Sequence, residues 1–128
     1  MNNKDGRERR KHKRFGVEEG TMAVLKCHTD FFGEIFDISE SGLALVYLSS
    51  GEQASGPLAL YIYLSSHGFN LRDLPCKSVY HLKIQKESPP GSDRPMKHGL
   101  QFGELTLNQR HKLQYFLKNH TTEKIRTL

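Results

Sequence analysis

Arginines near the N-terminus are the residues of this 128-residue chain best suited to hold an anionic ligand. Arg10 and Arg14 are four residues apart, and Arg9 directly precedes them. A guanidinium group stays charged, and its planar fork can donate two parallel hydrogen bonds to a phosphate, which a lysine cannot reproduce. The residue type therefore favours an anionic ligand.

The distribution of charge along the chain also indicates an anionic partner. The first 14 residues hold seven Lys/Arg and two Asp/Glu, a net charge of +5, and the whole chain, with 19 and 14, is also +5. The remaining 114 residues therefore carry 12 cations and 12 anions. A basic arm on an electrically balanced body favours an anionic partner. By itself the arm could also be a solvated tail, or a segment that binds nucleic acid or acidic lipid.

A second polar motif lies about twenty residues further along the chain. Residues 37–42 read Asp-Ile-Ser-Glu-Ser-Gly, with Asp37, Ser39 and Gly42 as the polar or small positions. On its own this stretch is an ordinary turn between two strands, in which Asp and Ser cap the turn and Gly supplies a positive φ.

Together the two motifs resemble the signature of the PilZ domain, the bacterial receptor for cyclic di-GMP. That signature is Arg-x-x-x-Arg followed by Asp-x-Ser-x-x-Gly, and the segment 98–102 with the helix after it resembles the end of the same domain, so the similarity spans residues 9–117. It implies a six-stranded antiparallel β-barrel with a C-terminal helix, a cytoplasmic location and cyclic di-GMP as the ligand. The ligand-binding residues that we expect are Arg9, Arg10, Arg14, Asp37, Ser39 and Gly42.

The resemblance also assigns these residues their roles. The arginines would bind the phosphates or the O6/N7 edge of a guanine, and the arm would fold over the ligand as a clasp. An ionised Asp37 can only accept hydrogen bonds, so it would complement the guanine donor edge, and Ser39 would donate or accept beside it. Gly42, without a Cβ, would permit a close approach of the ligand or an unusual φ.

The elements that must position these side chains follow from hydrophobic periodicity. Short apolar or alternating segments separated by turn residues predict strands, and Thr106 with Gln109 forms a capping box that predicts a helix ending near residue 119. Six or seven short strands followed by one helix predict a small antiparallel barrel capped by that helix. The expected domain organisation is a flexible basic arm at 1–14, a barrel with its helix at 15–120 and a frayed tail at 121–128. The expected strands are residues 21–28, 31–38, 42–48, 57–64, 69–74, 76–85 and 96–102.

Other functional classes find little support in the residues. The longest apolar run has seven residues, from 58 to 64, well short of the ~18 that span a bilayer, and no apolar segment typical of a secretory signal follows the basic start. Cys27 and Cys76 form no Cys-x-x-Cys pair, and no His or Cys spacing is typical of a zinc site, so we expect reduced thiols, with Cys27 in the core, and no metal. No catalytic motif is present, and we expect neither enzymatic activity nor a cofactor.

The leading hypothesis is a single-domain cyclic di-GMP receptor that relays its signal to an unidentified protein when the arm becomes ordered. One alternative is a protein-interaction adaptor that has the PilZ fold and no ligand, which the presence of both motifs disfavours. Another is a nucleic-acid-binding protein that uses the basic arm. The residues leave open whether one or two ligand molecules bind, the oligomeric state and the regulated process.

Overall fold

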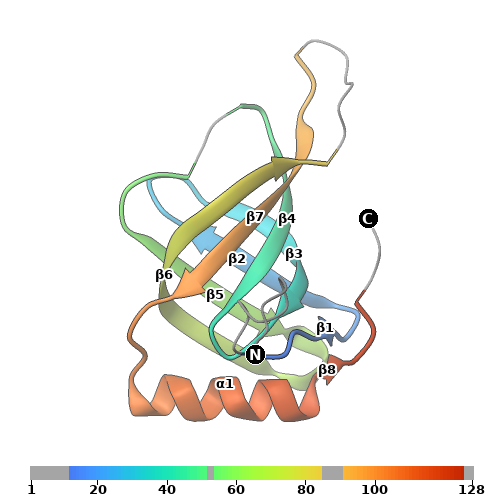
Figure 1. Ribbon diagram of the computed structural model, residues 1–128, viewed down its shortest axis with the longest axis vertical. Helices are drawn as coiled ribbons and strands as arrows, with labels where there is room; N and C mark the ends of the chain where they lie inside the picture. The colour runs from blue at the N-terminus through green and yellow to red at the C-terminus, as the bar shows by residue number, and fades with distance from the viewer. Residues whose placement is uncertain (1–11, 52–53, 85–90, 126–128) are drawn as a thin grey trace, which may run out of the picture.

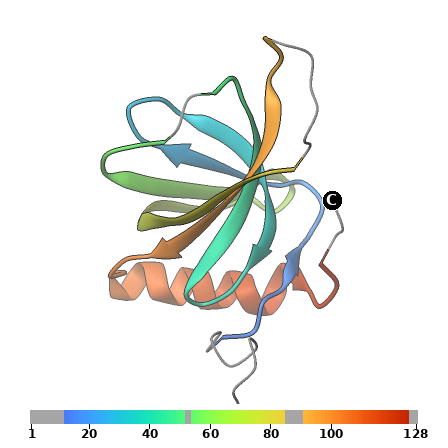
Figure 2. The same cartoon turned by 45° about the horizontal axis from the view of Figure 1, so that its top comes forward.

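The computed structural model describes residues 12–51, 54–84 and 91–125, and most of these form a closed barrel of antiparallel strands (Figures 1 and 2). Neighbouring strands follow the order β2-β3-β4-β7-β6-β5, which confirms the expected six-stranded barrel. Closure leaves no unpaired sheet edge among these six strands. Their bounds are β2 (Thr21–Lys26), β3 (Phe31–Ile38), β4 (Gly42–Ser49), β5 (Leu58–Leu64), β6 (Phe69–Lys83) and β7 (Arg94–Phe102).

The barrel interior is filled by apolar side chains from every strand. In β3, buried and more exposed positions alternate over Phe31–Glu34, as a strand with one inward face requires. Ile35, Leu45, Leu60 and Leu74 are almost completely buried in this core. Cys27 follows the end of β2 and packs against the core only in part, and its thiol donates a 2.9 Å hydrogen bond to the Thr29 carbonyl oxygen.

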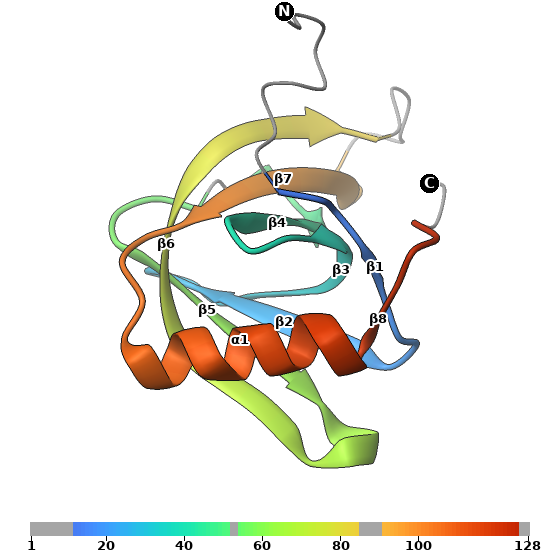
Figure 3. The same ribbon diagram turned by 60° about the horizontal axis from the view of Figure 1, so that its bottom comes forward.

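The helix α1 (Leu107–Asn119) lies across one end of the barrel (Figure 3). It begins with the predicted capping box: the Gln109 amide donates to the Thr106 hydroxyl at 3.0 Å, and the Gln109 side-chain oxygen accepts from the Thr106 amide at 2.9 Å. Leu113 and Phe116 are buried against the barrel core. No helix in the described part of the chain is both long and apolar enough to cross a membrane.

β6 corrects one expectation, because the two strands expected at 69–74 and 76–85 form one continuous strand that ends at Lys83, while residue 85 lies outside the described residues. Its first half pairs with β5 and its second half with β7, and Cys76 pairs with both. Pro75, which falls between the two expected strands, precedes this change of partner. A proline lacks an N–H donor, and strands tolerate it where pairing changes or the chain bends. The bend is marked by Asp73, whose φ is 57°.

The two ends of the described chain meet in a small second sheet. β1 (Gly16–Val17) pairs with β8 (Thr121–Thr122), which lies in the segment for which we expected a frayed tail. The helix does end at Asn119, but His120 is buried and its carbonyl oxygen accepts a 3.1 Å hydrogen bond from the Glu18 amide. This contact with the start of the chain, invisible in local sequence, holds the segment after the helix.

Candidate functional site

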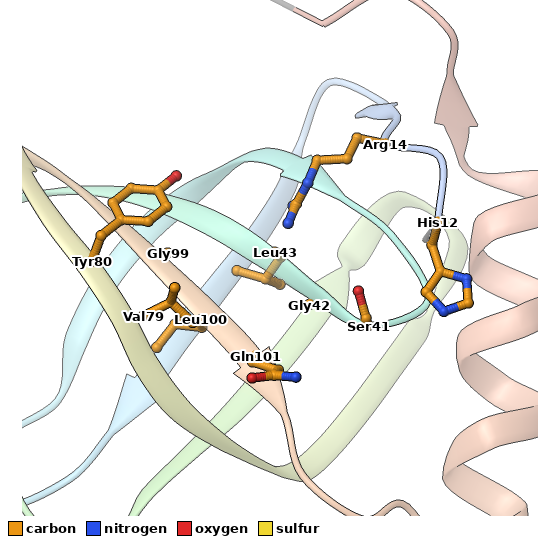
Figure 4. A pocket seen from close by; sticks show the side chains of 10 residues that line it. All are labelled: His12, Arg14, Ser41, Gly42, Leu43, Val79, Tyr80, Gly99, Leu100 and Gln101. Atoms are coloured by element: carbon orange, nitrogen blue, oxygen red, sulfur yellow. The ribbon is translucent and has the colours of Figure 1, made fainter. Parts of the chain in front are cut away.

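A cavity of about 490 Å³ lies on the barrel wall beside the end of the basic arm (Figure 4). Its lining comes from the arm, from the start of β4, and from the paired strands β6 and β7. The lining residues are His12, Arg14, Ser41, Gly42, Leu43, Val79, Tyr80, Gly99, Leu100 and Gln101.

Arg14 joins the two motifs predicted from the sequence. Its Nη1 donates a 2.8 Å hydrogen bond to Oδ1 of Asp37, and the side chains of the two residues are 24% and 8% exposed, respectively. Phe15 fixes the backbone beside this pair, because it exchanges two 2.9 Å hydrogen bonds with Ile38. The Arg14 guanidinium is therefore held by both a charged partner and a strand-like backbone.

The Arg14 side chain also keeps unused donor capacity. Figure 4 shows it extending from the arm toward Leu43 at the floor of the cavity. Its Nε is buried and has no hydrogen-bond partner among the residues that the structure describes. A buried, unsatisfied donor of a charged group is costly, and because solvent cannot reach this atom, an anion would satisfy it only after the Arg14 side chain moves.

Ser39 lies in the turn between β3 and β4 and is fully engaged there. Its hydroxyl oxygen accepts a 3.1 Å hydrogen bond from the Ser41 amide, and its own amide donates at 2.8 Å to the Gly42 carbonyl oxygen. Only 1% of Ser39 is exposed. In this arrangement Ser39 shapes the turn that brings Ser41 to the cavity.

Gly42 is required by the packing of β4 against β7. A Cβ at this position would overlap the carbonyl oxygen of Leu100, and the Gly42 φ is not positive. The close approach that its sequence position suggested is therefore made by a neighbouring strand. Gly42 still lines the cavity.

The structure describes four of the six expected ligand-binding residues. Arg9 and Arg10 lie outside the described residues. Arg14 and Asp37 are in direct contact, and Arg14 and Gly42 line the same cavity. Ser39 lies in the turn next to the cavity.

Sequence reasoning missed Tyr80 as a part of the cavity. Tyr80 is 38% exposed and pairs with Gly99 across β6 and β7. A Cβ at Gly99 would overlap the Tyr80 ring, so this glycine allows the ring to lie flat against β7. The feature that could have identified Tyr80 is its pairing with a glycine on the neighbouring strand. That pairing can be recognised only when the strand register is known.

A buried histidine ties together the three strands that line the cavity. His98 is fully buried, and its ring nitrogens contact the Tyr47 hydroxyl at 3.0 Å and the Ser78 hydroxyl at 2.8 Å. Burial, with a smaller contribution from nearby His81, lowers the pKa of His98 to about 4. Burial likewise raises the pKa of Tyr47 to about 12. Both groups are therefore neutral at pH 7, and the hydrogen bonds of His98 with Tyr47 and Ser78 connect β4, β6 and β7.

Comparisons with known proteins identify the fold of this chain. No protein-family description matches the chain, and no curated protein matches its sequence. Solved structures do match its fold. The PilZ domain of YcgR from Escherichia coli, solved with c-di-GMP, has a TM-score of 0.65 and 8% sequence identity over 86% of this chain and 89% of that domain.

Two structures of MrkH match at similar levels. The K. pneumonia MrkH–c-di-GMP complex has a TM-score of 0.65 and 17% identity, and MrkH described as a c-di-GMP-dependent transcription regulatory factor has 0.61 and 16%. Each match covers 86% of this chain and about half of MrkH, 51% and 50% respectively. The fold is thus shared despite low sequence identity. The chain has the fold of PilZ domains.

Proposed function

We propose that this chain is a receptor for cyclic di-GMP and that the ligand binds in the cavity beside Arg14. The observation that carries this proposal is the Arg14–Asp37 pair. It unites an arginine from the first motif with the aspartate of the second, at a cavity of about 490 Å³ on a PilZ-like barrel. Small-molecule sites are typically hollows of this size with a few fixed polar groups.

The chemistry of the cavity suits a nucleotide dianion. The Arg14 side chain is 24% exposed and supplies a positive charge for a phosphate, and its buried Nε would gain a phosphate oxygen as acceptor when the side chain moves onto the ligand. The exposed part of the Tyr80 ring offers a flat surface on which a guanine could stack. In this proposal Arg9 and Arg10 close over the ligand from the side of the arm, as the resemblance implies.

Asp37 has a double role in the proposal. In the described state it accepts from Arg14, and its carboxylate has enough acceptor sites to accept from a guanine N1/N2 edge as well. Because its side chain is only 8% exposed, both interactions would form away from bulk water, where charge-assisted hydrogen bonds are strongest.

We further propose that closure of the arm is the signal that a partner protein reads. The end of the arm already contacts two other surface segments: Lys13 lies 3.4 Å from the Glu123 carboxylate, and His12 lies 3.9 Å from Glu40. Movement of the arm onto a ligand would rearrange both contacts and so change the surface next to β8 and the β3–β4 turn. The partner is an unidentified protein.

The test is a calorimetric titration of cyclic di-GMP into the purified protein, with GTP and a short RNA as controls. Selective binding of cyclic di-GMP supports the proposal, and the stoichiometry decides between one and two ligand molecules. Binding of RNA alone would instead assign the basic arm to nucleic acid. No binding of any of the three would leave a protein-interaction adaptor.

An Asp37→Ala variant separates the first two outcomes further. Recognition of a guanine edge requires the carboxylate, so this variant should lose cyclic di-GMP. A ligand bound only through phosphate would bind slightly more tightly, because a nearby negative charge is removed. Far-ultraviolet circular dichroism would confirm that the variant keeps the barrel.

A further inference from the structure

Glu18, His67 and His120 bring three metal-ligating side chains together, away from the cavity. His120 Nδ1 lies 2.8 Å from Glu18 Oε2, and His67 Nε2 lies 3.4 Å from Glu18 Oε1. One ligating atom from each of the three residues lies within 4.8 Å of the other two. None of the three residues lines the cavity beside Arg14.

We propose that these three side chains form a binding site for a divalent transition metal ion, with Zn²⁺ as the best fit. Two imidazoles and one carboxylate are a ligand set that zinc uses when a fourth position holds water. Ligands about 2.0–2.1 Å from a tetrahedral zinc lie about 3.3 Å from one another. The separations of 2.8 Å from His120 Nδ1 to Glu18 Oε2 and 3.4 Å from His67 Nε2 to Glu18 Oε1 are close to that value. They involve different oxygens, so small movements of the carboxylate and the imidazoles would bring all three side chains onto one ion.

The backbone already fixes two of the ligands. The Glu18 amide donates to the His120 carbonyl oxygen at 3.1 Å, and the Glu18 carbonyl oxygen accepts from the amide and the hydroxyl of Thr21 at 3.2 and 2.7 Å. His120 caps the helix, and its amide donates to the Phe116 carbonyl oxygen at 2.8 Å. Pre-positioned ligands lose little conformational entropy on binding a metal.

The third ligand comes from the turn between β5 and β6. His67 ends the short 3₁₀ helix η2 (Ser65–His67), and Gly68 follows it with a φ of 62°, which reverses the chain. Its side chain is 48% exposed, so an ion can enter from solvent on this side. In Figure 3 the turn containing η2, the end of α1 and the β1–β2 turn gather on the same side of the molecule.

Aromatic side chains enclose the buried part of the cluster. The His120 side chain is only 9% exposed, and the ring centroids of Phe69, Tyr115 and Phe116 each lie 5.8 Å from its own. An apolar surround of this kind limits water on one side and strengthens the interaction of the cation with Glu18. A hydrogen-bonded bridge of one carboxylate between two imidazoles is the rival explanation of the same geometry.

A bound ion would join three segments that are distant in sequence. The ligands precede β2, connect β5 to β6 and follow α1, so the ion would crosslink both ends of the described chain to a barrel turn. Glu18 lies four residues after Arg14, and the ion would therefore also fix the base of the arm. This proposal does not depend on the identity of the ligand in the cavity.

The test is a zinc titration of the full-length, untagged protein after treatment with a chelator, with a competing chromophoric indicator to report free Zn²⁺. We expect one equivalent to bind and the melting temperature to rise by at least about 5 °C at saturating Zn²⁺. Co²⁺ in place of Zn²⁺ should give visible absorption bands of a low-coordinate site. Absence of a one-equivalent binding step would overturn the proposal.

Variants separate the metal site from a hydrogen-bonded bridge. His67→Ala removes an exposed ligand and should weaken Zn²⁺ binding by more than about 100-fold, because even loss of an outer-shell partner costs about 10–100-fold. Glu18→Gln keeps the size of the side chain and should also weaken binding. His111→Ala, which changes an exposed histidine of α1, is the control and should bind as the wild type does. Unchanged affinity in His67→Ala and Glu18→Gln would assign the bound ion to other residues and refute the proposal.

Discussion

The Arg14 guanidinium donates a 2.8 Å hydrogen bond to the carboxylate of Asp37, which lies 23 residues further along the chain. This contact places the end of the basic arm on the barrel wall and at the edge of the cavity. Because both side chains are largely buried, the pair is shielded from the solvent that weakens surface ion pairs. The arm and the barrel therefore already share one charged contact without a ligand.

Replacing Arg14 with lysine should separate charge from geometry. Arg14→Lys keeps the positive charge but loses the planar fork, and we expect affinity for cyclic di-GMP to fall at least about tenfold, equivalent to about 1.4 kcal/mol. Titration calorimetry measures the change. Lys13→Ala, which removes an exposed cation next to it, is the control and should have a much smaller effect. Equal affinity of Arg14→Lys and wild type would show that Arg14 contributes charge alone.

Substitution of Gly42 should destabilise the fold. Gly42→Ala places a Cβ against the backbone of Leu100, and we expect the free energy of unfolding to fall by about 1–3 kcal/mol or more. Urea denaturation measures this loss. Gly99→Ala in a Tyr80→Ala background is the matched comparison, since there the overlapping ring has been removed, and it should cost less. A neutral Gly42→Ala variant would show that β4 and β7 can separate at this point.

His98 should make stability depend on pH. Its pKa of about 4 in the folded state is below the ordinary value of 6.5, so the unfolded chain binds a proton that the folded chain resists. Stability is fully present above pH 6.5 and should fall by up to about 3 kcal/mol as the pH drops toward 4. Urea denaturation at several pH values compares wild type with His98→Gln, in which this component should vanish. His111→Gln should retain it, and parallel curves for wild type and His98→Gln would contradict the assignment.

Gln109 links the helix to the bend in β6. Its side-chain amide donates at 3.1 Å to the carbonyl oxygens of both Arg72 and Asp73 while its oxygen completes the capping box. Gln109→Glu keeps the capping box but loses both donors, and we expect a loss of about 1–2 kcal/mol of unfolding free energy. Gln114→Glu, at an exposed position of the same helix, controls for the added charge. If the two variants unfold alike, the link to β6 contributes nothing.

Local patterns in the sequence were sufficient to predict the barrel strands and the helix. The short apolar segment at residues 31–38 and the capping box at Thr106 are defined by neighbouring residues, so they needed no knowledge of tertiary contacts. The continuity of β6 through Pro75 could not be predicted in this way. It depends on the change of partner at Cys76, which is a property of the closed sheet.

The residues of the candidate site likewise fall into two groups, those that motif spacing predicts and those that depend on tertiary contacts. Arg14, Asp37 and Gly42 were identified from motif spacing, and the structure brings Arg14 to both of the others through direct contact or a shared cavity. The pairing of Tyr80 with Gly99 and the hydrogen bond between His98 and Ser78 depend on the register between β6 and β7. Glu18 and His120 are 102 residues apart, so their contact could be found only in the folded chain.

The measurement that tests the central claim most directly is a titration of ¹⁵N-labelled protein with cyclic di-GMP, followed by amide chemical shifts. Gly42, Gly99 and Gln101 line the cavity, and their backbone amides report on it without any substitution. We expect these amides and the Arg14 amide to shift together and to saturate, while amides of the β1–β2 turn and η2 stay in place. Absence of saturable shifts, or shifts confined to residues outside the cavity, would contradict the assignment of the cyclic di-GMP site.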